Sequence, residues 1–174
     1  GGRGSGAGSR WTPGARYLFL MRAYRLVKAR CADTSLDGSG AKAHGGRWNS
    51  KGVPMVYASD SIALAALELL VHLHRGEILN QYWLYSLELP DRSLLSLHLE
   101  ALPADWRRDP APLSTAEIGD EWAASLLSPA LVVPSTVVPA QRNILLNPAH
   151  KDFQKLIGGV TSAPFDFDPR LINR

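Results

Sequence analysis

A short apolar strand that runs directly into an apolar helix constrains the fold of this chain most. The stretch is PMVYASDSIALAALELLVHLHR, residues 54–75. Its pattern predicts a strand over Met55–Ser59 and a helix that ends at about His74, with Ser59 or Asp60 as the cap. A strand and a helix joined this closely are expected to pack against each other, so the stretch forms one wall of the domain.

Glu68 is the only charged residue in the central part of this helix, Ile62–Val71. A carboxylate buried there without a partner would cost several kcal/mol or stay protonated. The helix by itself therefore favours a Glu68 that faces water. The alternative is a Glu68 that faces a ligand cleft, with Tyr57 beside it near the end of the strand.

Length and composition favour one globular domain. The chain has 174 residues, 45% hydrophobic and 20% charged, which suffices for a sizeable core. Its net charge of +3 is too small to argue for nucleic-acid binding. Cys31 is the only cysteine, so no intrachain disulfide can form, and no apolar run is long enough to span a bilayer. We expect a cytoplasmic protein that has no contact with a membrane.

Residues 1–15 are rich in Gly, Ser and Arg and lack hydrophobic periodicity. We therefore expect residues 1–19 to form a flexible leader outside the fold, whose native origin the sequence leaves open. Residues 20–174 are expected to form the domain.

Short strands alternate with few helices along the domain, which predicts an α+β fold with a partly antiparallel sheet. Residues 29–50 are expected to be a long loop and residues 91–113 to be irregular, with short helical turns. Ser114 and Glu117 form a capping-box pattern at the start of a second helix. Besides 55–59, strands are expected within residues 21–27, 81–89, 129–135, 143–146 and 160–171, and helices over 114–127 and 150–157.

The sequence lacks the common phosphate-binding, hydrolase and zinc-protease motifs. His72 and His74 are two residues apart and would point to different sides of a helix, so a metal site is not expected. Cys31 has no flanking motif that marks a reactive thiol, so it is a poor candidate for a nucleophile.

Six polar residues at strand ends, in the apolar helix and in the loop at 29–50, called the glycine-rich loop below, can together bind a dinucleotide. Arginines grip phosphates, an aromatic ring stacks on a flat base, and a carboxylate stabilises positive charge on a sugar carbon. Each residue alone also has an ordinary structural explanation, such as a surface ion pair or a turn. The candidates are Arg25, Arg47, Tyr57, Glu68, Ser135 and Asn147.

The order of these residues resembles the RES-domain family, the toxin half of bacterial Xre–RES toxin–antitoxin pairs. That family is named for an arginine, a glutamate and a serine, which match Arg25 in YRL, Glu68 in ALE and Ser135 in VPS. The stretches GGRWN at 45–49, VYAS at 56–59, NP at 147–148 and KDF at 151–153 also look like the family pattern. The similarity covers about residues 23–160.

The resemblance implies a single ADP-ribosyltransferase-like domain with a split mixed β-sheet, flanking helices and NAD⁺ in a cleft. NAD⁺ would be the substrate, with no true cofactor, and the nicotinamide–ribose bond would break by hydrolysis or phosphorolysis. A helix-turn-helix antitoxin of the Xre type would block the cleft. The implied catalytic residues are Glu68, Arg47, Tyr57 and Ser135, and the implied NAD⁺ contacts are Arg25, Arg47, Tyr57, Trp48 and Asn147.

Three other functions stay open at this point. The same fold could transfer ADP-ribose to a target protein, because surface loops select the acceptor. A non-catalytic nucleic-acid-binding module would use basic residues such as Arg22, Arg25, Arg30, Lys42 and Arg47, although the modest net charge argues against it. The last alternative is a plain interaction protein without activity.

Overall fold

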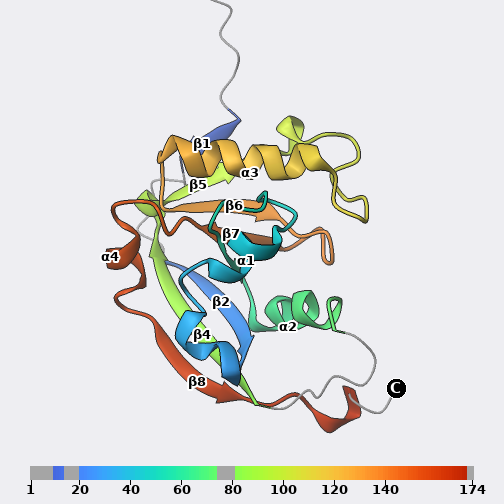
Figure 1. Ribbon diagram of the computed structural model, residues 1–174, viewed down its shortest axis with the longest axis vertical. Coiled ribbons are helices and arrows are strands. Elements are labelled where there is room, and N and C mark those ends of the chain that lie inside the picture. The colour runs from blue at the N-terminus through green and yellow to red at the C-terminus, as the bar shows by residue number, and fades with distance from the viewer. Residues whose placement is uncertain (1–9, 14–19, 74–80, 172–174) are drawn as a thin grey trace, which may run out of the picture.

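Eight strands form one mixed sheet in this computed structural model, which describes residues 10–13, 20–73 and 81–171. In chain order the strands are β1 (Trp11–Pro13), β2 (Leu20–Lys28), β3 (Val56–Ser59), β4 (Tyr82–Pro90), β5 (Leu94–Leu97), β6 (Ala130–Pro134), β7 (Arg142–Leu146) and β8 (Thr161–Phe165). In space their order is β1-β5-β6-β7-β3-β2-β4-β8 (Figure 1). Only the β5–β6 pair is parallel.

In the described residues, four α-helices and four short 3-10 turns accompany the strands. The helices are α1 (Ser39–His44), α2 (Ile62–Leu70), α3 (Leu113–Ser125) and α4 (Phe153–Ile157). The 3-10 turns are η1 (Ala29–Thr34), η2 (Asp91–Ser93), η3 (Leu99–Ala101) and η4 (Pro169–Leu171), of which η4 follows the last strand. In Figure 1, α3 lies along β5 and β6, whereas α2 lies beside β2 and contacts both β2 and β3. Within the described part of the chain, no helix has the length and apolar character needed to cross a membrane.

The sheet is nearly split in its middle, between β3 and β2. These two strands share one registered pair, Tyr24 with Ser59. By contrast, β2 is in register with β4 from Leu20–Pro90 to Lys28–Tyr82, and β3 is in register with β7 along its whole length. Beyond Tyr24 and Ser59 the two halves diverge, so the predicted split mixed sheet is confirmed.

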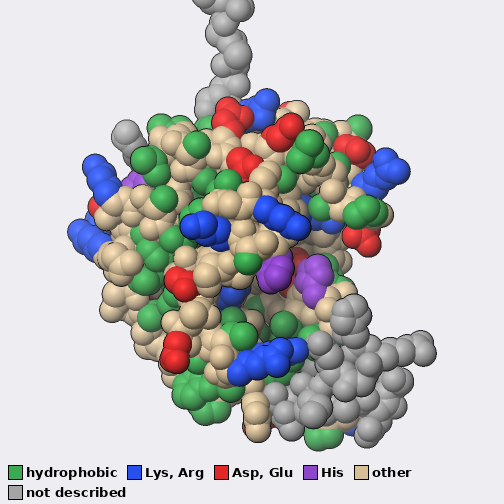
Figure 2. All heavy atoms as spheres, viewed as in Figure 1, with side chains coloured by type: hydrophobic (Ala, Val, Ile, Leu, Met, Phe, Trp, Pro, Cys, Tyr) green, Lys and Arg blue, Asp and Glu red, His purple; other side chains and the backbone are tan. Residues whose placement is uncertain are grey.

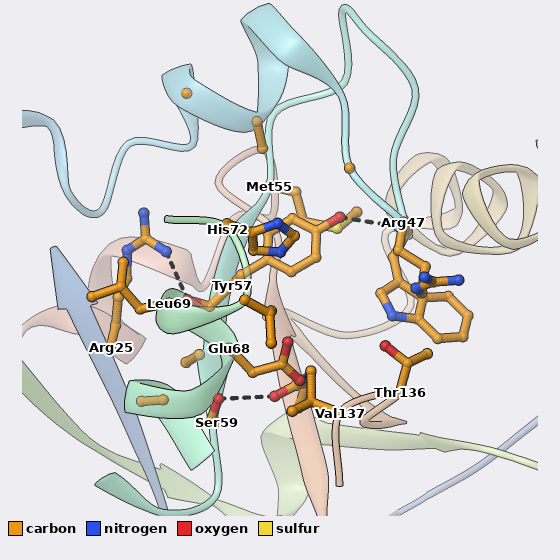
Figure 3. A pocket seen from close by; sticks show the side chains of 18 of the residues that line it. Arg25, Arg47, Met55, Tyr57, Ser59, Glu68, Leu69, His72, Thr136 and Val137 are labelled. Atoms are coloured by element: carbon orange, nitrogen blue, oxygen red, sulfur yellow. Dashed lines mark hydrogen bonds between the residues drawn. The ribbon is translucent and has the colours of Figure 1, made fainter. Parts of the chain in front are cut away.

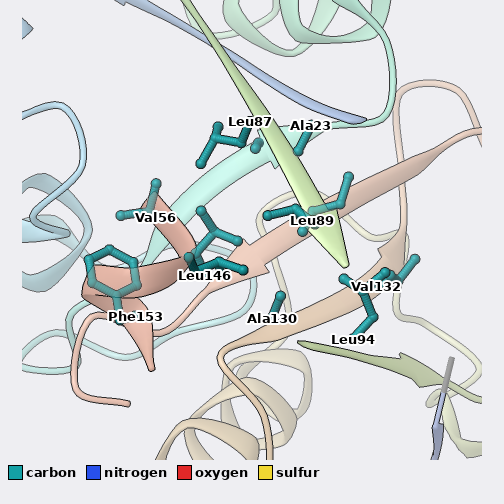
Figure 4. Packing of buried hydrophobic residues seen from close by; sticks show 12 residues of the cluster. Ala23, Val56, Leu87, Leu89, Leu94, Ala130, Val132, Leu146 and Phe153 are labelled. Atoms are coloured by element: carbon teal, nitrogen blue, oxygen red, sulfur yellow. The ribbon is translucent and has the colours of Figure 1, made fainter. Parts of the chain in front are cut away.

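Three apolar clusters pack on the sheet, and the first of them joins its two halves. The first fills the junction of the halves with side chains of β2, β4, β6 and β7 and with Phe153 of α4 (Figure 4). The second lies under α3, around Trp122 and Trp48, and the third lies under α2, around Leu26 and Ala65. Each helix with a buried face thus covers its own part of the sheet.

The predicted strands at 21–27, 55–59, 81–89, 129–135, 143–146 and 160–171 are confirmed, as are the three predicted helices. The expectation that residues 1–19 lie outside the fold is wrong for Trp11–Pro13, which form β1 and pair with β5. Strand β5 itself lies in the stretch expected to be irregular, and α1 lies in the expected long loop. These elements are too short for hydrophobic periodicity to show them.

The predicted helix caps are wrong in both cases. Helix α2 begins after Ser61, whose Oγ accepts a hydrogen bond from the backbone N–H of Leu64, and it ends at Leu70. His74 lies outside the described residues. Helix α3 begins after Pro112 and has no capping box, because no side chain caps its first turn. Neighbouring serines and threonines offer several possible caps, and the packing of the helix selects among them.

Gly119 of α3 makes the closest approach between a helix and the glycine-rich loop. A Cβ at this position would overlap the backbone carbonyl of Trp48. One residue further along α3, the Asp120 side chain accepts a hydrogen bond from the N–H of Ser50 at 3.0 Å. Helix α3 therefore seats directly on the loop that carries Arg47.

We predict that Gly119→Ala lowers the free energy of unfolding by about 1–3 kcal/mol, because the helix must move off the loop. Chemical denaturation measures this change. Gly159→Ala is the matched control, since nothing lies within 4 Å of a Cβ there. Equal stability of the two variants would contradict the close approach of α3 and the loop.

Candidate active site

A cavity of about 790 Å³ opens where the sheet splits. Residues of both separated strands line it, Tyr24–Leu26 from β2 and Tyr57–Ser59 from β3. The glycine-rich loop, the inner face of α2 and the start of the β6–β7 connection complete the wall. This volume is in the range of pockets that enclose a whole small ligand.

Glu68 points from α2 into this cavity rather than to solvent. It lies one turn after Leu64, which is fully buried, so the two side chains share one face of the helix. Other sides of the helix expose apolar side chains, with Ile62 at 37% and Leu67 at 41%. The preference for a water-facing Glu68 is therefore wrong. A helix that is apolar on all sides has no polar stripe to show which face is buried.

Two side chains fix one oxygen of the Glu68 carboxylate. Ser135 Oγ donates to Oε1 at 2.7 Å and Asn143 Nδ2 donates to the same oxygen at 2.6 Å. No described residue donates a hydrogen bond to Oε2. Figure 3 shows the side chain reaching from α2 toward Val137, at the cavity wall. The carboxylate is thus held by its inner oxygen and presents the outer one to a ligand.

Tyr57 forms the centre of the cavity wall, and its hydroxyl is used inside the protein. The hydroxyl donates to Asn49 Oδ1 at 2.7 Å and accepts from the N–H of Trp48 at 3.1 Å. Burial raises the pKa of this phenol, so it stays neutral. A Cβ on Gly46 would lie 2.6 Å from the Tyr57 hydroxyl, which explains the glycine there. The ring can stack on a ligand. The hydroxyl, however, already donates and accepts hydrogen bonds within the protein, so it is not free to donate to a ligand sugar.

Arg25 bridges the open part of the sheet. Its Nε donates to the carbonyl of Ser35 and its Nη1 donates to the carbonyl of Tyr57, both at 2.8 Å. Burial lowers the pKa of Arg25, and the nearby Asp37 carboxylate opposes that effect. The Arg25 side chain therefore joins β2 to β3 where backbone hydrogen bonds between these strands are missing. Arg25 also lines the cavity, and its guanidinium has N–H groups beyond the two that bond these carbonyls.

Arg47 lies at the other end of the Tyr57 side chain (Figure 3). It occupies the tip of a tight turn closed by the bridge between Gly46 and Asn49. Its Nη1 donates to the carbonyls of Trp106 at 2.7 Å and Arg108 at 3.0 Å. Arg47 thereby ties the residue 103–112 segment to the cavity. Because Tyr57 separates them, the two arginines reach a ligand from different ends.

Three further predicted site residues have structural partners. Ser135 is fully buried, and its Oγ also accepts from the N–H groups of Val137 and Val138. It therefore contacts Glu68, where the sequence suggested a bond to the ligand. The Trp48 side chain borders the cavity but is 2% exposed and packs in the cluster under α3.

Asn147 is not among the residues that line the cavity. Its Nδ2 donates to the carbonyl of Ala123 and its Oδ1 accepts from the N–H of Ala149. The predicted contact with NAD⁺ is therefore corrected to a structural role at the end of β7. An asparagine before a proline carries no signal that separates these two roles.

The sequence did not identify Asn143, Ser59 or His72 as site residues. All three line the cavity, and Asn143 bonds directly to Glu68. A polar residue at the start of the apolar strand 143–146 was the available signal for Asn143. His72 follows α2 and lies over the Tyr57 ring in the view of Figure 3.

A family model for the RES domain matches residues 22–168, which is most of the chain. The chain belongs to the RES-domain family. The predicted family is confirmed, and its arginine, glutamate and serine are brought to the cavity, the serine through its bond to Glu68.

Curated relatives support the same membership. The chain is 44% identical to "Toxin Res" of Yersinia enterocolitica over 151 residues, which cover 87% of this chain and 99% of the relative. It is 41% identical to "Toxin Res" of Photorhabdus laumondii over 87% of this chain and 97% of the relative. It is 43% identical to "Prs ADP-ribosylating toxin" of a Sphingobium species over 80% of this chain and 88% of the relative. The prediction that the chain is a toxin of this family is confirmed.

The fold also matches a solved structure. A chain of the Mycobacterium tuberculosis MbcT–MbcA toxin–antitoxin complex superposes with a TM-score of 0.64 at 20% identity, covering 94% of this chain and 90% of that one. At this identity the likeness concerns the fold alone, and it shows that the two chains share this arrangement of sheet and helices.

We predict that Tyr57→Phe lowers the free energy of unfolding by about 1 kcal/mol, because Asn49 and the Trp48 amide lose their shared partner. Hydrogen exchange of the Trp48 amide should accelerate as well. Tyr24→Phe is the control, since no hydrogen bond of the Tyr24 hydroxyl is found among the described residues. If the Trp48 amide exchanges at the same rate in both variants, the Tyr57 hydroxyl does not hold the loop.

Proposed function

We propose that this chain is a bacterial toxin that consumes NAD⁺ by cleaving the bond between nicotinamide and ribose. The observation that carries the proposal is the Glu68 carboxylate, held by one oxygen and presented to a cavity that Arg25 and Arg47 also line. In this reaction the C1′–N1 bond breaks and nicotinamide leaves with the bonding electrons. Water or phosphate then bonds to C1′, and its proton passes to solvent.

The charge that develops in this reaction suits Glu68. As nicotinamide leaves, the ribose becomes oxocarbenium-like, and positive charge grows on C1′ and the ring oxygen. A carboxylate oxygen fixed beside the ribose stabilises this charge and can accept hydrogen bonds from ribose hydroxyls. Two hydrogen bonds to Oε1 prevent the carboxylate from turning away, so little reorganisation is needed during the reaction.

The remaining site residues bind and orient NAD⁺ in this proposal. The Tyr57 ring offers a flat surface for the nicotinamide or its ribose. Arg25 and Arg47 contribute positive charge at either end of Tyr57, and their N–H groups that do not bond carbonyls are available to phosphates. Ser135 acts through Glu68 and does not serve as a nucleophile.

A second activity is supported by one relative. The Sphingobium protein is named an ADP-ribosylating toxin and is 43% identical to this chain. Transfer of ADP-ribose to a protein uses the same first step and replaces water or phosphate by a side chain of the target. The two activities differ in the acceptor, so products distinguish them.

An antitoxin partner belongs to the same proposal. The structural neighbour was solved as a toxin–antitoxin complex. We place an antitoxin with an Xre-type helix-turn-helix domain over the mouth of the cavity, where it would exclude NAD⁺. Such a pair acts in the bacterial cytoplasm, where NAD⁺ is available and the single exposed Cys31 stays reduced.

We predict that Glu68→Gln lowers kcat for nicotinamide release from NAD⁺ by about 100-fold or more, because the amide keeps the shape of the side chain and loses its charge. Purified protein is incubated with NAD⁺, with and without phosphate, and nicotinamide is quantified. Glu117→Gln, an exposed position on α3, is the matched control and keeps wild-type turnover.

The products assign the acceptor. Free ADP-ribose indicates hydrolysis, a product heavier by one phosphate indicates phosphorolysis, and a modified protein indicates transfer to a target. A wild-type protein that releases no nicotinamide under any of these conditions would overturn the proposal, and equal release by wild type and Glu68→Gln would overturn the role of Glu68.

The second prediction concerns the antitoxin. Adding an equimolar amount of the cognate antitoxin to the same assay should suppress nicotinamide release by wild type, because it covers the cavity. Full turnover in a stoichiometric complex would exclude occlusion of this cavity.

A further inference from the structure

The side chains of β3 and β7 make a second layer of contacts behind Glu68. Ser59 on β3 and Asn143 on β7 are a registered cross-strand pair. Ser59 Oγ donates to Asn143 Oδ1 at 2.8 Å, and Asn143 Nδ2 donates to Glu68 Oε1 at 2.6 Å. The hydrogen bonds therefore run in one direction, from Ser59 through Asn143 to the carboxylate.

This direction removes the ambiguity of an amide side chain. An asparagine can present either its oxygen or its nitrogen to a neighbour, and an oxygen next to Glu68 would repel the carboxylate. The acceptor-only carboxylate therefore selects the amide nitrogen. The hydroxyl of the buried Ser59, which can donate or accept, donates to the amide oxygen and so holds Asn143 in this orientation from the neighbouring strand.

We infer that Asn143, oriented by Ser59, is a positioning residue that holds Glu68 in its reactive geometry. The inference rests on the proposed function. Ser135, at the end of β6, supplies the other hydrogen bond to Oε1. With this single contact the carboxylate could still rotate about Oε1. A second donor from β7 fixes the plane of the carboxylate, and with it the direction of Oε2.

Removal of the amide should slow the reaction and leave substrate binding in place. We expect Asn143→Ala to lower kcat for nicotinamide release by about 10- to 100-fold, as for other groups that orient a reactive side chain. KM for NAD⁺ should change by about threefold or less, because the arginines and Tyr57 are intact. Gln141→Ala is the matched control, since it removes an amide that bonds Ser61 and does not contact Glu68.

Asn143→Asp gives a readout that a merely structural role would not produce. Aspartate can donate to Glu68 only while it holds a proton, and two ionised carboxylates this close repel each other. The rate of this variant relative to wild type should therefore rise as the pH falls, whereas the relative rate of Asn143→Ala should stay level. The ratio to wild type cancels the titration of other groups around the cavity, which are Tyr24, Arg25, Arg47, Tyr57, His72, Arg107 and Asp109.

A double-variant cycle tests the role of Ser59. Ser59→Ala should lower kcat by roughly threefold to tenfold, and the same change in the Asn143→Ala background should have no further effect, because Ser59 acts through the amide. Ser59→Ala alone, which removes a single oxygen atom, also tests the proposal if Asn143→Ala fails to fold, which thermal unfolding would reveal.

The outcomes separate the two proposals. A wild type that releases nicotinamide together with an Asn143→Ala variant of unchanged kcat, or one altered only in KM, overturns the positioning role alone. A flat relative pH profile for Asn143→Asp, or independent effects of Ser59 and Asn143, also overturns it. A wild type without any turnover of NAD⁺ overturns the proposed function and this inference with it.

Discussion

The fold and the site both depend on one gap in the sheet, the single registered pair between β2 and β3. A continuous ladder there would fill the space in which the cavity lies. The gap leaves backbone groups that need partners, and a carbonyl at the edge of a split sheet is costly to bury unpaired. Arg25 meets this need by donating to the Tyr57 carbonyl from the neighbouring strand. The arginine therefore joins the two halves and brings positive charge into the cavity at once.

The Glu68 carboxylate adds a second constraint, because three elements must meet for it to be stable. Its donors come from the end of β6 and from β7, and the carboxylate comes from α2. An inward carboxylate with these donors avoids the penalty of an unpaired buried charge. The tight turn that carries Arg47 is fixed in a similar way, by α3 behind it and by the Tyr57 hydroxyl in front. A ligand would thus meet a wall that is already formed.

Prediction from the sequence succeeded where the local pattern and the tertiary environment agree. The strands over 21–27 and 143–146 read as apolar runs and are central in the sheet, so periodicity found them. The sequence did not predict β5 or the short β1. Both strands are defined by their pairing, β1 with β5 and β5 with β6, more than by their composition. The predicted contact of Asn147 with NAD⁺ was wrong for a related reason. The Asn147 side chain bonds a carbonyl of α3, a contact that no local pattern encodes.

The sequence alone determined six of the strands, three of the helices and the set of chemical groups, because these follow from local hydrophobic patterns and from a family arrangement of arginine, glutamate and serine. Only the tertiary structure decided where those groups point. Glu68 is separated from Ser135 by 67 positions and from Asn143 by 75, and their contacts arise from the strand order of the sheet. Helix α2 is apolar on every side, so its sequence left Glu68 facing water. The burial of the α2 face that carries Leu64 turns the carboxylate inward, and Asn143 and Ser135 stabilise it there.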